Sequence, residues 1–251
     1  MKKITAIEKK AKSYQVYFGE EQIEVEPEVF FKYHLHLEME LDLKAYRELI
    51  HDNEYALYFR LGIAKLKKLM TKKEMVEHLL SKGATLELST KLVKLFEEKK
   101  YIDDFSYTKI YFQIKGKSEG PELIKNKLRN KGISPEIITG FINNYDEDSV
   151  LSELVEKKIK AIKNKSKRQA IQTIKSHFLS KGFSMDAVDR NIKKNLQYFQ
   201  GNELELIEKE YAKYIRKYQS QMDAAKFNYF VTQKLYAKGF SIDDIKKVLN
   251  S

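Results

Sequence analysis

Seven lysine and arginine residues fall within twelve consecutive positions of the chain, 157–168, and no acidic residue lies among them. They are Lys157, Lys158, Lys160, Lys163, Lys165, Lys167 and Arg168. Such a cluster can neutralise phosphate groups and release their counterions. Because no aromatic residue is interleaved with these cations, we expect contact with a nucleic-acid backbone rather than stacking on bases. The alternative is a solvated, charged helix face without a ligand.

A second, weaker group of cations surrounds the dipeptide Gly120-Pro121. The candidate contacts in it are Lys115, Lys117, Lys125 and Arg129, and Lys127 and Lys131 lie beside them. Residues 1–150 hold 26 Lys and Arg against 25 Asp and Glu, whereas residues 151–251 hold 21 against 11. The formal charge of +11 therefore lies almost wholly in the C-terminal part. This asymmetry indicates a polyanion or an acidic protein as partner.

Two other short motifs lack the neighbours that their chemistry needs. The sequence 116–118, Gly-Lys-Ser, resembles the end of a phosphate-binding loop, but Tyr111 stands where that loop needs its first glycine. Asp103 and Asp104 are adjacent acids without a third acid or a histidine nearby. Such a pair is more typical of a helix N-cap and first turn than of a metal site.

Histidine and cysteine give no support for a metal centre or a catalytic nucleophile. His34 and His36 would share one face if their segment were a strand, but no third zinc ligand accompanies them. The chain contains no Cys, which excludes disulfides, thiolate zinc sites and cysteine nucleophiles. No serine elbow, Ser/His/Asp order or HExxH sequence is present. We therefore expect no enzyme, no catalytic residue, no metal and no cofactor.

Four copies of one pattern predict the elements that position the cations. Each copy is centred on a Lys-Gly dipeptide, and the glycines Gly83, Gly132, Gly182 and Gly239 recur at intervals of 49, 50 and 57 residues. Apolar residues eight and four positions earlier indicate a helix that the glycine ends. They are Met75, Leu79, Ile124, Leu128, Ile174, Phe178, Val231 and Leu235. Hydroxyl side chains two positions later are N-caps of a following helix: Thr85, Ser134, Ser184 and Ser241.

Since further residues separate each helix pair from the one before it, the repeating unit has room for three helices. We predict a mainly α protein whose tandem three-helix repeats form an elongated, curved solenoid with one continuous core. The predicted repeats span 42–100, 101–145, 146–199 and 200–251. We expect the spaced tyrosines to pack in the core and between repeats; they are Tyr107, Tyr111, Tyr211, Tyr214, Tyr218 and Tyr229.

Residues 1–41 do not follow the repeat. Alternating, β-rich segments separated by a turn at Gly19 predict a small N-terminal antiparallel β-element. A short helix is expected after Pro27, because the fixed φ of proline suits a helix start. The segment 35–41 alternates strictly and is open to a strand or to a helical continuation.

One segment resembles the signature of the RecX family. Residues 101–111 read YIDDFSYTKIY, residues 120–124 read GPELI and residues 128–133 read LRNKGI. The family signature likewise combines an Asp-Asp helix start, a Gly-Pro helix start and a Lys-Gly-Ile helix stop within one repeat. The opening residues 4–9, ITAIEK, and the series of three-helix units behind a β-element are similar to the long RecX proteins of Gram-positive bacteria.

The resemblance implies a regulator rather than an enzyme. Members of the family modulate the RecA recombinase, usually as inhibitors of strand exchange and ATP hydrolysis, and lie in the groove of the RecA–DNA filament. The expected partner is therefore the RecA filament on single-stranded DNA, with DNA itself as a further direct contact, and the chain is expected to be a monomer. The alternative is a stand-alone nucleic-acid-binding helical-repeat protein. Because no signal peptide or membrane helix is evident, we expect a cytoplasmic protein without a membrane partner.

Overall fold

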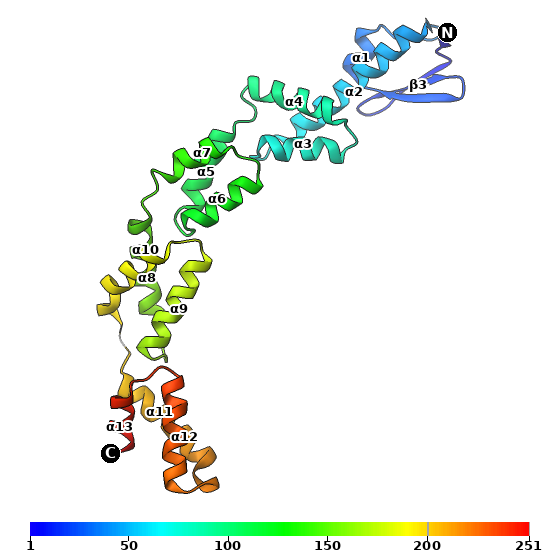
Figure 1. The fold of residues 1–251 in the computed structure, drawn as a ribbon. Helices are drawn as coiled ribbons and strands as arrows, with labels where there is room; N and C mark the ends of the chain where they lie inside the picture. The colour runs from blue at the N-terminus through cyan, green and yellow to red at the C-terminus, as the bar shows by residue number, and fades with distance from the viewer. Residues whose placement is uncertain (200, 251) are drawn as a thin grey trace. The chain divides into compact units, whose positions relative to one another are not determined.

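A computed structural model describes residues 1–199 and 201–250 of the chain (Figure 1). The described chain is mainly helical, and its strands lie within the first 41 residues, which confirms the predicted fold class. It divides into two compact units. The first comprises Met1–Thr108 and Asn130–Ser134, and the second comprises Lys109–Arg129 and Pro135–Ser251.

The N-terminal element contains a small antiparallel sheet. Strands β2 (Ala6–Lys9), β3 (Tyr14–Phe18) and β4 (Glu21–Val25) pair in that order, with Val16 opposite both Ile7 and Ile23. Strands β1 (Lys2–Lys3) and β5 (Glu40–Leu41) form a separate antiparallel pair. Helix α1 (Pro27–Lys32) begins at Pro27, as the sequence predicts.

The segment 35–41 is neither a strand along its length nor a helix. Only Glu40–Leu41 is extended and paired, while His34 at φ 49° and Glu38 at φ 67° adopt left-handed backbone conformations. A strand needs negative φ throughout, so these two residues interrupt it. His34 and His36 therefore do not share a strand face, and a ring nitrogen of His36 lies 2.9 Å from the backbone oxygen of His34.

A series of helices follows the β-element. They are α2 (Leu43–Lys65), α3 (Lys72–Ser81), α4 (Leu86–Glu98), α5 (Asp104–Lys115), α6 (Pro121–Asn130), α7 (Pro135–Ile142), α8 (Glu147–Ala161), α9 (Lys167–Ser180), α10 (Met185–Asn195), α11 (Glu203–Tyr218), α12 (Ala224–Ala237) and α13 (Ile242–Leu249), with short 3-10 turns at η1 (Leu196–Tyr198) and η2 (Gln219–Gln221). Thr85, Ser184 and Ser241 are N-caps, and each accepts a hydrogen bond from the backbone N–H three residues later.

The Lys-Gly dipeptides end their helices as predicted. At the end of α9, the Gly182 N–H donates to the Leu179 carbonyl (2.9 Å) and the Phe183 N–H donates to the Phe178 carbonyl (3.2 Å). This pair of bonds is the Schellman motif, and it requires the left-handed φ of 82° that Gly182 adopts. The residue after each glycine is apolar and buried, a feature that the sequence analysis missed: Ala84, Ile133, Phe183 and Phe240.

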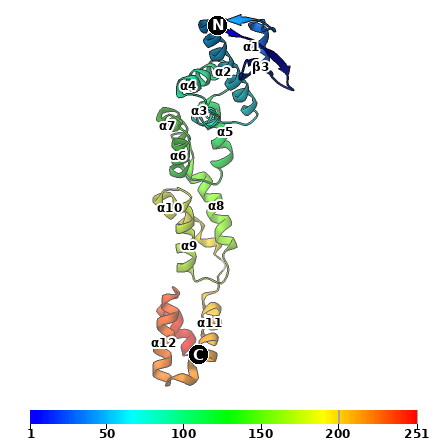
Figure 2. The ribbon, with the colours of Figure 1, turned by 90° about the vertical axis from the view of Figure 1, so that its right-hand side faces the viewer.

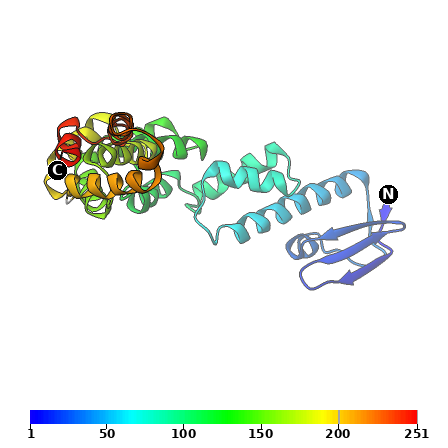
Figure 3. The same cartoon turned by 90° about the horizontal axis from the view of Figure 1, so that it is seen from below.

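The prediction of one continuous core is wrong for the described residues, whose buried side chains gather in separate clusters. One cluster joins the β-element to the start of α2, and another joins the end of α2 to α3 and α4. Figure 3 shows the long helix α2 extending from the β-element to α3 and α4. In the second unit, α8, α9 and α10 enclose one cluster, and α11, α12 and α13 enclose another. Figure 2 shows the backbones of these helices, and the helices within each group are in contact. Large rings such as Phe178 and Phe227 fill the interiors of the α8–α10 and α11–α13 groups, so each of these two groups closes a core of its own.

The predicted packing of the tyrosines is correct for some of them and wrong for one. Tyr107 is buried, and Tyr211, Tyr214 and Tyr218 pack against the cluster of α11–α13. Tyr229 is instead 70% exposed on α12. Helical spacing alone cannot tell the two faces of α12 apart at this position, because apolar residues occur on both.

Candidate functional site

Two hydrogen bonds in the second unit fasten the start of one helix to the Lys-Gly end of a later helix. The Gly120 N–H, directly before α6, donates to the Lys181 carbonyl at the end of α9 (2.8 Å). The Ser166 hydroxyl, at the N-cap of α9, donates to the Lys238 carbonyl at the end of α12 (2.7 Å). We call a hydrogen bond of this kind, between the start of one helix and the Lys-Gly end of another, a joint. The second joint places the cations at the start of α9 beside the end of α12.

The first unit contains an equivalent joint. The Thr71 hydroxyl, at the N-cap of α3, donates to the Lys131 carbonyl (2.8 Å). The ammonium group of Lys131 pairs with Glu74 of the same N-terminal turn and lies 5.5 Å from the ring centre of Tyr107. The Lys131 carbonyl thus accepts the hydrogen bond of this joint, and the Lys131 ammonium group already forms an ion pair with Glu74.

The predicted cluster 157–168 divides between three elements. Lys157, Lys158 and Lys160 lie near the end of α8, Lys163 and Lys165 lie in the connection to α9, and Lys167 and Arg168 begin α9. Lys163, Lys167 and Arg168 are exposed. The structure therefore brings exposed cations to the α8–α9 connection, next to the joint at Ser166.

Some charges of this cluster have partners outside the twelve-residue window. Lys157 lies 3.8 Å from Glu153, and Lys160 lies 2.5 Å from Glu156, each one helical turn earlier. The hydrogen bond to Glu156 raises the pKa of Lys160. Lys165 is half-buried and donates to the Thr173 hydroxyl (2.9 Å). Exposed pairs of this kind are weak, so Lys157 and Lys160 can exchange their partners for phosphate.

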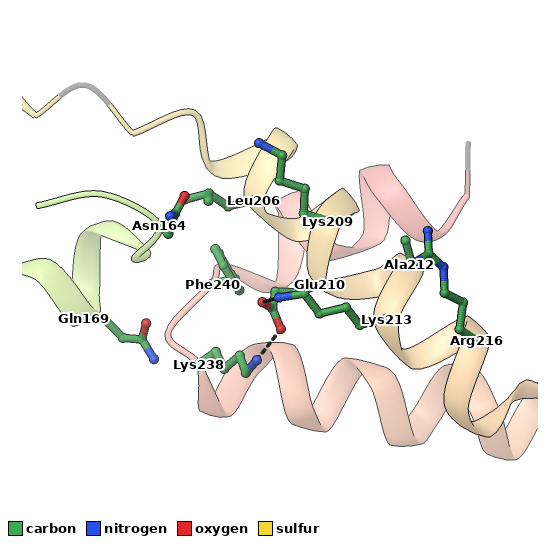
Figure 4. A pocket seen from close by; sticks show the side chains of 10 residues that line it. All are labelled: Asn164, Gln169, Leu206, Lys209, Glu210, Ala212, Lys213, Arg216, Lys238 and Phe240. Atoms are coloured by element: carbon green, nitrogen blue, oxygen red, sulfur yellow. Dashed lines mark hydrogen bonds and ion pairs between the residues drawn. The ribbon is translucent and has the colours of Figure 1, made fainter.

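A hollow of about 500 Å³ lies beside the joint at Ser166, between α11 and the connection to α9 (Figure 4). We call it the α11 hollow; its lining includes Asn164, Gln169, Lys209, Glu210, Lys213, Arg216, Lys238 and Phe240. Glu210 pairs with Lys213 and with Lys238. Although burial acts to raise it, these hydrogen bonds hold the pKa of Glu210 below its usual value. The α11 hollow thus carries four cations against one ionised acid, and it suits an anionic ligand.

A second hollow, of about 440 Å³, is lined by the first turns of α9 and the end of α12. We call it the α12 hollow; its lining includes Lys167, Arg168, Gln172, Lys175, Glu203, Tyr236, Gly239 and Phe240. The Arg168 guanidinium lies 6.0 Å from the ring centre of Tyr236. Glu203 accepts a hydrogen bond from the Lys167 backbone N–H (2.6 Å), which occupies one oxygen of this acid. Both hollows share Phe240 as a lining residue.

The second predicted group of cations is partly engaged. Lys125 lies 3.4 Å from Glu122, and Lys127 lies 2.8 Å from the buried Glu119. Lys115, Lys117 and Arg129 are exposed. The turn at 116–118 follows helix α5, whereas a phosphate-binding loop of this type follows a strand.

The turn at 116–118 is closed by a buried tyrosine. The Tyr145 hydroxyl lies 2.9 Å from the Gly116 carbonyl and 3.0 Å from the Glu119 carbonyl. Burial raises the pKa of Tyr145, so the phenol stays protonated and can donate. The Gly116 and Glu119 carbonyl oxygens therefore have a hydrogen-bond partner within the chain.

Residues 1–199 and 201–250 contain neither a metal-binding cluster nor a membrane-spanning helix. In that part of the chain, no group of three or more His, Asp or Glu side chains is placed to hold a metal ion. None of the helices described there combines the length and the apolar character that crossing a bilayer requires.

Comparison with known proteins decides the family. No protein-family model matches the chain. Regulatory protein RecX of Clostridium tetani is 31% identical over 214 residues, which cover 79% of this chain and 96% of that relative. This chain belongs to the RecX family. Regulatory protein RecX of Streptococcus mutans serotype c is 27% identical over 262 residues and covers 98% of both chains, so the similarity includes the N-terminal element.

Solved structures share the RecX fold. A crystal structure of regulatory protein RecX superposes with a TM-score of 0.59 at 21% identity and covers 77% of this chain and 100% of that chain. RecX from Lactobacillus salivarius gives a TM-score of 0.53 at 24% identity and covers 57% of this chain and 97% of that chain. The resemblance seen in the sequence at residues 101–133 is thus confirmed.

Proposed function

We propose that this chain regulates the RecA recombinase as an inhibitor that binds in the groove of the RecA filament on single-stranded DNA. Binding there would change the ATP hydrolysis, strand exchange and stability of the filament. The observation that carries the proposal is the similarity, along 98% of the chain, to a protein named for regulation. RecA is the proposed target because members of the family modulate it.

The charge of the second unit supports this proposal. The α8–α9 connection and the first turn of α9 expose Lys163, Lys167 and Arg168, and the α11 hollow adds further cations beside them. A filament on DNA presents phosphate groups at regular intervals, and cations gain affinity for phosphate by releasing counterions. We place the contacts with the filament on this basic surface, with the cations near α5 and α6 as a second contact region.

A ligand changes an assembly only through its different affinities for the assembled and unassembled states. A chain that contacts successive subunits binds the filament and not free RecA, so it couples its own binding to the state of the filament. The size of any effect on ATP hydrolysis is therefore set by this difference in affinity.

The test is a titration of this chain into RecA from the same organism, hydrolysing ATP on single-stranded DNA. Naked DNA is kept in excess, so that simple competition for DNA does not lower the rate. We expect the rate to fall at or below one chain per RecA subunit. An unchanged rate, together with tight binding of the chain to the DNA alone, would show a stand-alone nucleic-acid-binding protein and overturn the proposal.

A further inference from the structure

An exposed aromatic ring joins the basic cluster in the folded chain, although none is interleaved with it in the sequence. Tyr236, near the end of α12, is 46% exposed and lines the α12 hollow together with Lys167 and Arg168. The absence of an interleaved aromatic residue in the sequence therefore does not carry over to the folded chain, where an exposed ring lies beside the cluster. The ring comes from a helix much further along the chain, and the joint at Ser166 brings it there.

The joint also orients the arginine beside this ring. A Cβ atom added to Gly239 would lie 3.1 Å from the Cβ of Arg168 and 2.9 Å from the Ser166 hydroxyl oxygen. The side-chain stem of Arg168 is thus packed against a position that only glycine can occupy, where φ is 86°. Its guanidinium lies 6.0 Å from the ring centre of Tyr236, so the cation and the ring adjoin before any ligand arrives, and this pre-arrangement lowers the cost of binding.

The other polar groups of the α12 hollow leave it positive. Lys167, Arg168 and Lys175 line it, and Glu203 is its acid. Lys175 pairs with Asp189 (2.7 Å), and Glu203 caps the start of α9 through the Lys167 N–H. An anionic group entering the hollow therefore meets the side chains of Lys167 and Arg168 first.

We propose that the α12 hollow binds single-stranded nucleic acid, with one base stacked on Tyr236 and the adjacent phosphates held by Arg168 and Lys167. Stacking platforms next to a positive groove bind single strands in this way, because every base has a π face. The inference deepens the proposed function and rests on it for placing a DNA strand beside the chain. In this proposal the α12 hollow contacts the DNA strand rather than RecA.

A second exposed ring favours a nucleic acid over an acidic peptide. Tyr229 is 70% exposed and precedes Tyr236 by seven residues on α12. Residues seven apart lie on the same face of a helix, here about 10 Å apart along its axis. Two rings at this spacing can take two bases of an extended strand, whereas an acidic peptide would need the cations and not the rings.

The experiment measures binding of the full chain to two labelled oligonucleotides of equal length by fluorescence anisotropy, without RecA. One is oligo-dT, and the other carries abasic sites throughout, so that it keeps the phosphates and loses the bases. We expect Tyr236→Ala to weaken binding to oligo-dT about tenfold and to leave binding to the abasic strand unchanged. Tyr236→Phe keeps an aromatic face and should bind both strands like the parent chain.

Two further variants separate stacking from charge and from general effects. Arg168→Gln should weaken binding to both strands and lower the slope of log K against log salt by about 0.7, the value for one phosphate contact on a single strand. Tyr101→Ala is the control, because Tyr101 is 52% exposed in the first unit. It should change neither affinity.

Equal losses on both strands, or no loss on oligo-dT, would overturn the inference. An unchanged DNA affinity with weaker binding to the RecA filament would assign Tyr236 to a protein contact instead. Thermal unfolding of each variant checks that the fold is retained. The outcome is separate from that of the RecA titration: binding to oligo-dT that needs Tyr236, without any effect on RecA, would leave this site standing and reject the proposed function.

Discussion

Two adjacent aspartates at the start of α5 have different environments. The Asp103 carboxylate accepts hydrogen bonds from the Ser106 hydroxyl (2.7 Å) and the Phe105 N–H (2.9 Å), and the bond from Ser106 lowers its pKa. Asp104 is only 5% exposed and accepts from the Lys72 backbone N–H (3.0 Å) at the start of α3. Burial raises the pKa of Asp104. Asp103 thus caps α5, as predicted. The Asp104 carboxylate instead accepts a hydrogen bond from the first turn of α3.

We expect Asp104→Asn to be better tolerated than Asp104→Ala. The asparagine keeps an oxygen for the Lys72 N–H, whereas alanine leaves that donor unpaired and should cost about 0.5–2 kcal/mol in the free energy of unfolding. Because the folded-state pKa of Asp104 is raised above 3.8, its contribution is fully present below that pH and is lost as the pH rises through the folded pKa. The stability of Asp104→Asn relative to the parent should therefore increase as the pH rises from 4.

Urea unfolding of both variants and the parent at several pH values checks this prediction. A difference between Asp104→Asn and the parent that stays constant from pH 3 to pH 7 would contradict the role of the buried charge. Equal losses in the two variants would show that the oxygen does not support α3.

At the scale of elements, the turn at Gly182 forms hydrogen bonds with two helices, α9 and α6. The Gly182 turn closes α9 and also receives the start of α6, since the Glu122 N–H donates to the Gly182 carbonyl (3.1 Å). A Cβ atom at Gly182 would lie 2.3 Å from the Leu123 nitrogen and 2.5 Å from the Leu123 Cβ. Gly83 closes α3 with a similar φ of 97°, but there the nearest atom to an added Cβ is the Tyr58 hydroxyl oxygen at 3.3 Å.

This pair of glycines gives a matched test of the joint. Both alanine variants pay about 1–2 kcal/mol for the left-handed conformation. Gly182→Ala must also displace the Leu123 backbone, and we expect about 1–3 kcal/mol of further loss from this overpacking. Chemical denaturation of the two variants measures the difference in the free energy of unfolding. Similar losses would mean that α6 does not need its close approach to the Gly182 turn.

The sequence predicts what depends on near neighbours. Helix ends follow from a glycine, a hydroxyl cap and apolar spacing between residues close in the sequence. The glycine stops and the caps at Thr85, Ser184 and Ser241 agree with the structure. The joints were missed because Gly120 and Lys181 lie 61 positions apart and neither has an unusual side chain for its role. The pairing of Arg168 with Tyr236 was missed for the same reason. The ion pair of Lys157 was predictable from the sequence, since Glu153 stands four residues earlier on the same helix face.

At the scale of the whole molecule, the proposed function depends on where the charge lies and not only on its total. Screening limits the reach of an exposed charge to about 10 Å at 0.1 M salt. A lysine remote from the contact surface therefore adds little to the affinity. The excess of cations in residues 151–251 should accordingly contribute most of the attraction to a filament.

Two charge-reversal variants with the same net charge test this expectation. The first changes Lys157, Lys160, Lys163 and Lys167 to Glu, and the second changes the exposed Lys67, Lys68, Lys94 and Lys99 to Glu. Binding to the RecA filament is measured by sedimentation at several salt concentrations. We expect the first variant to bind at least tenfold more weakly than the parent at low salt, with the difference shrinking as salt rises, because phosphate contacts are lost. The second should bind like the parent. If the first variant bound like the parent, the basic cluster would not contact the filament, and equal losses in both would show that only the net charge matters.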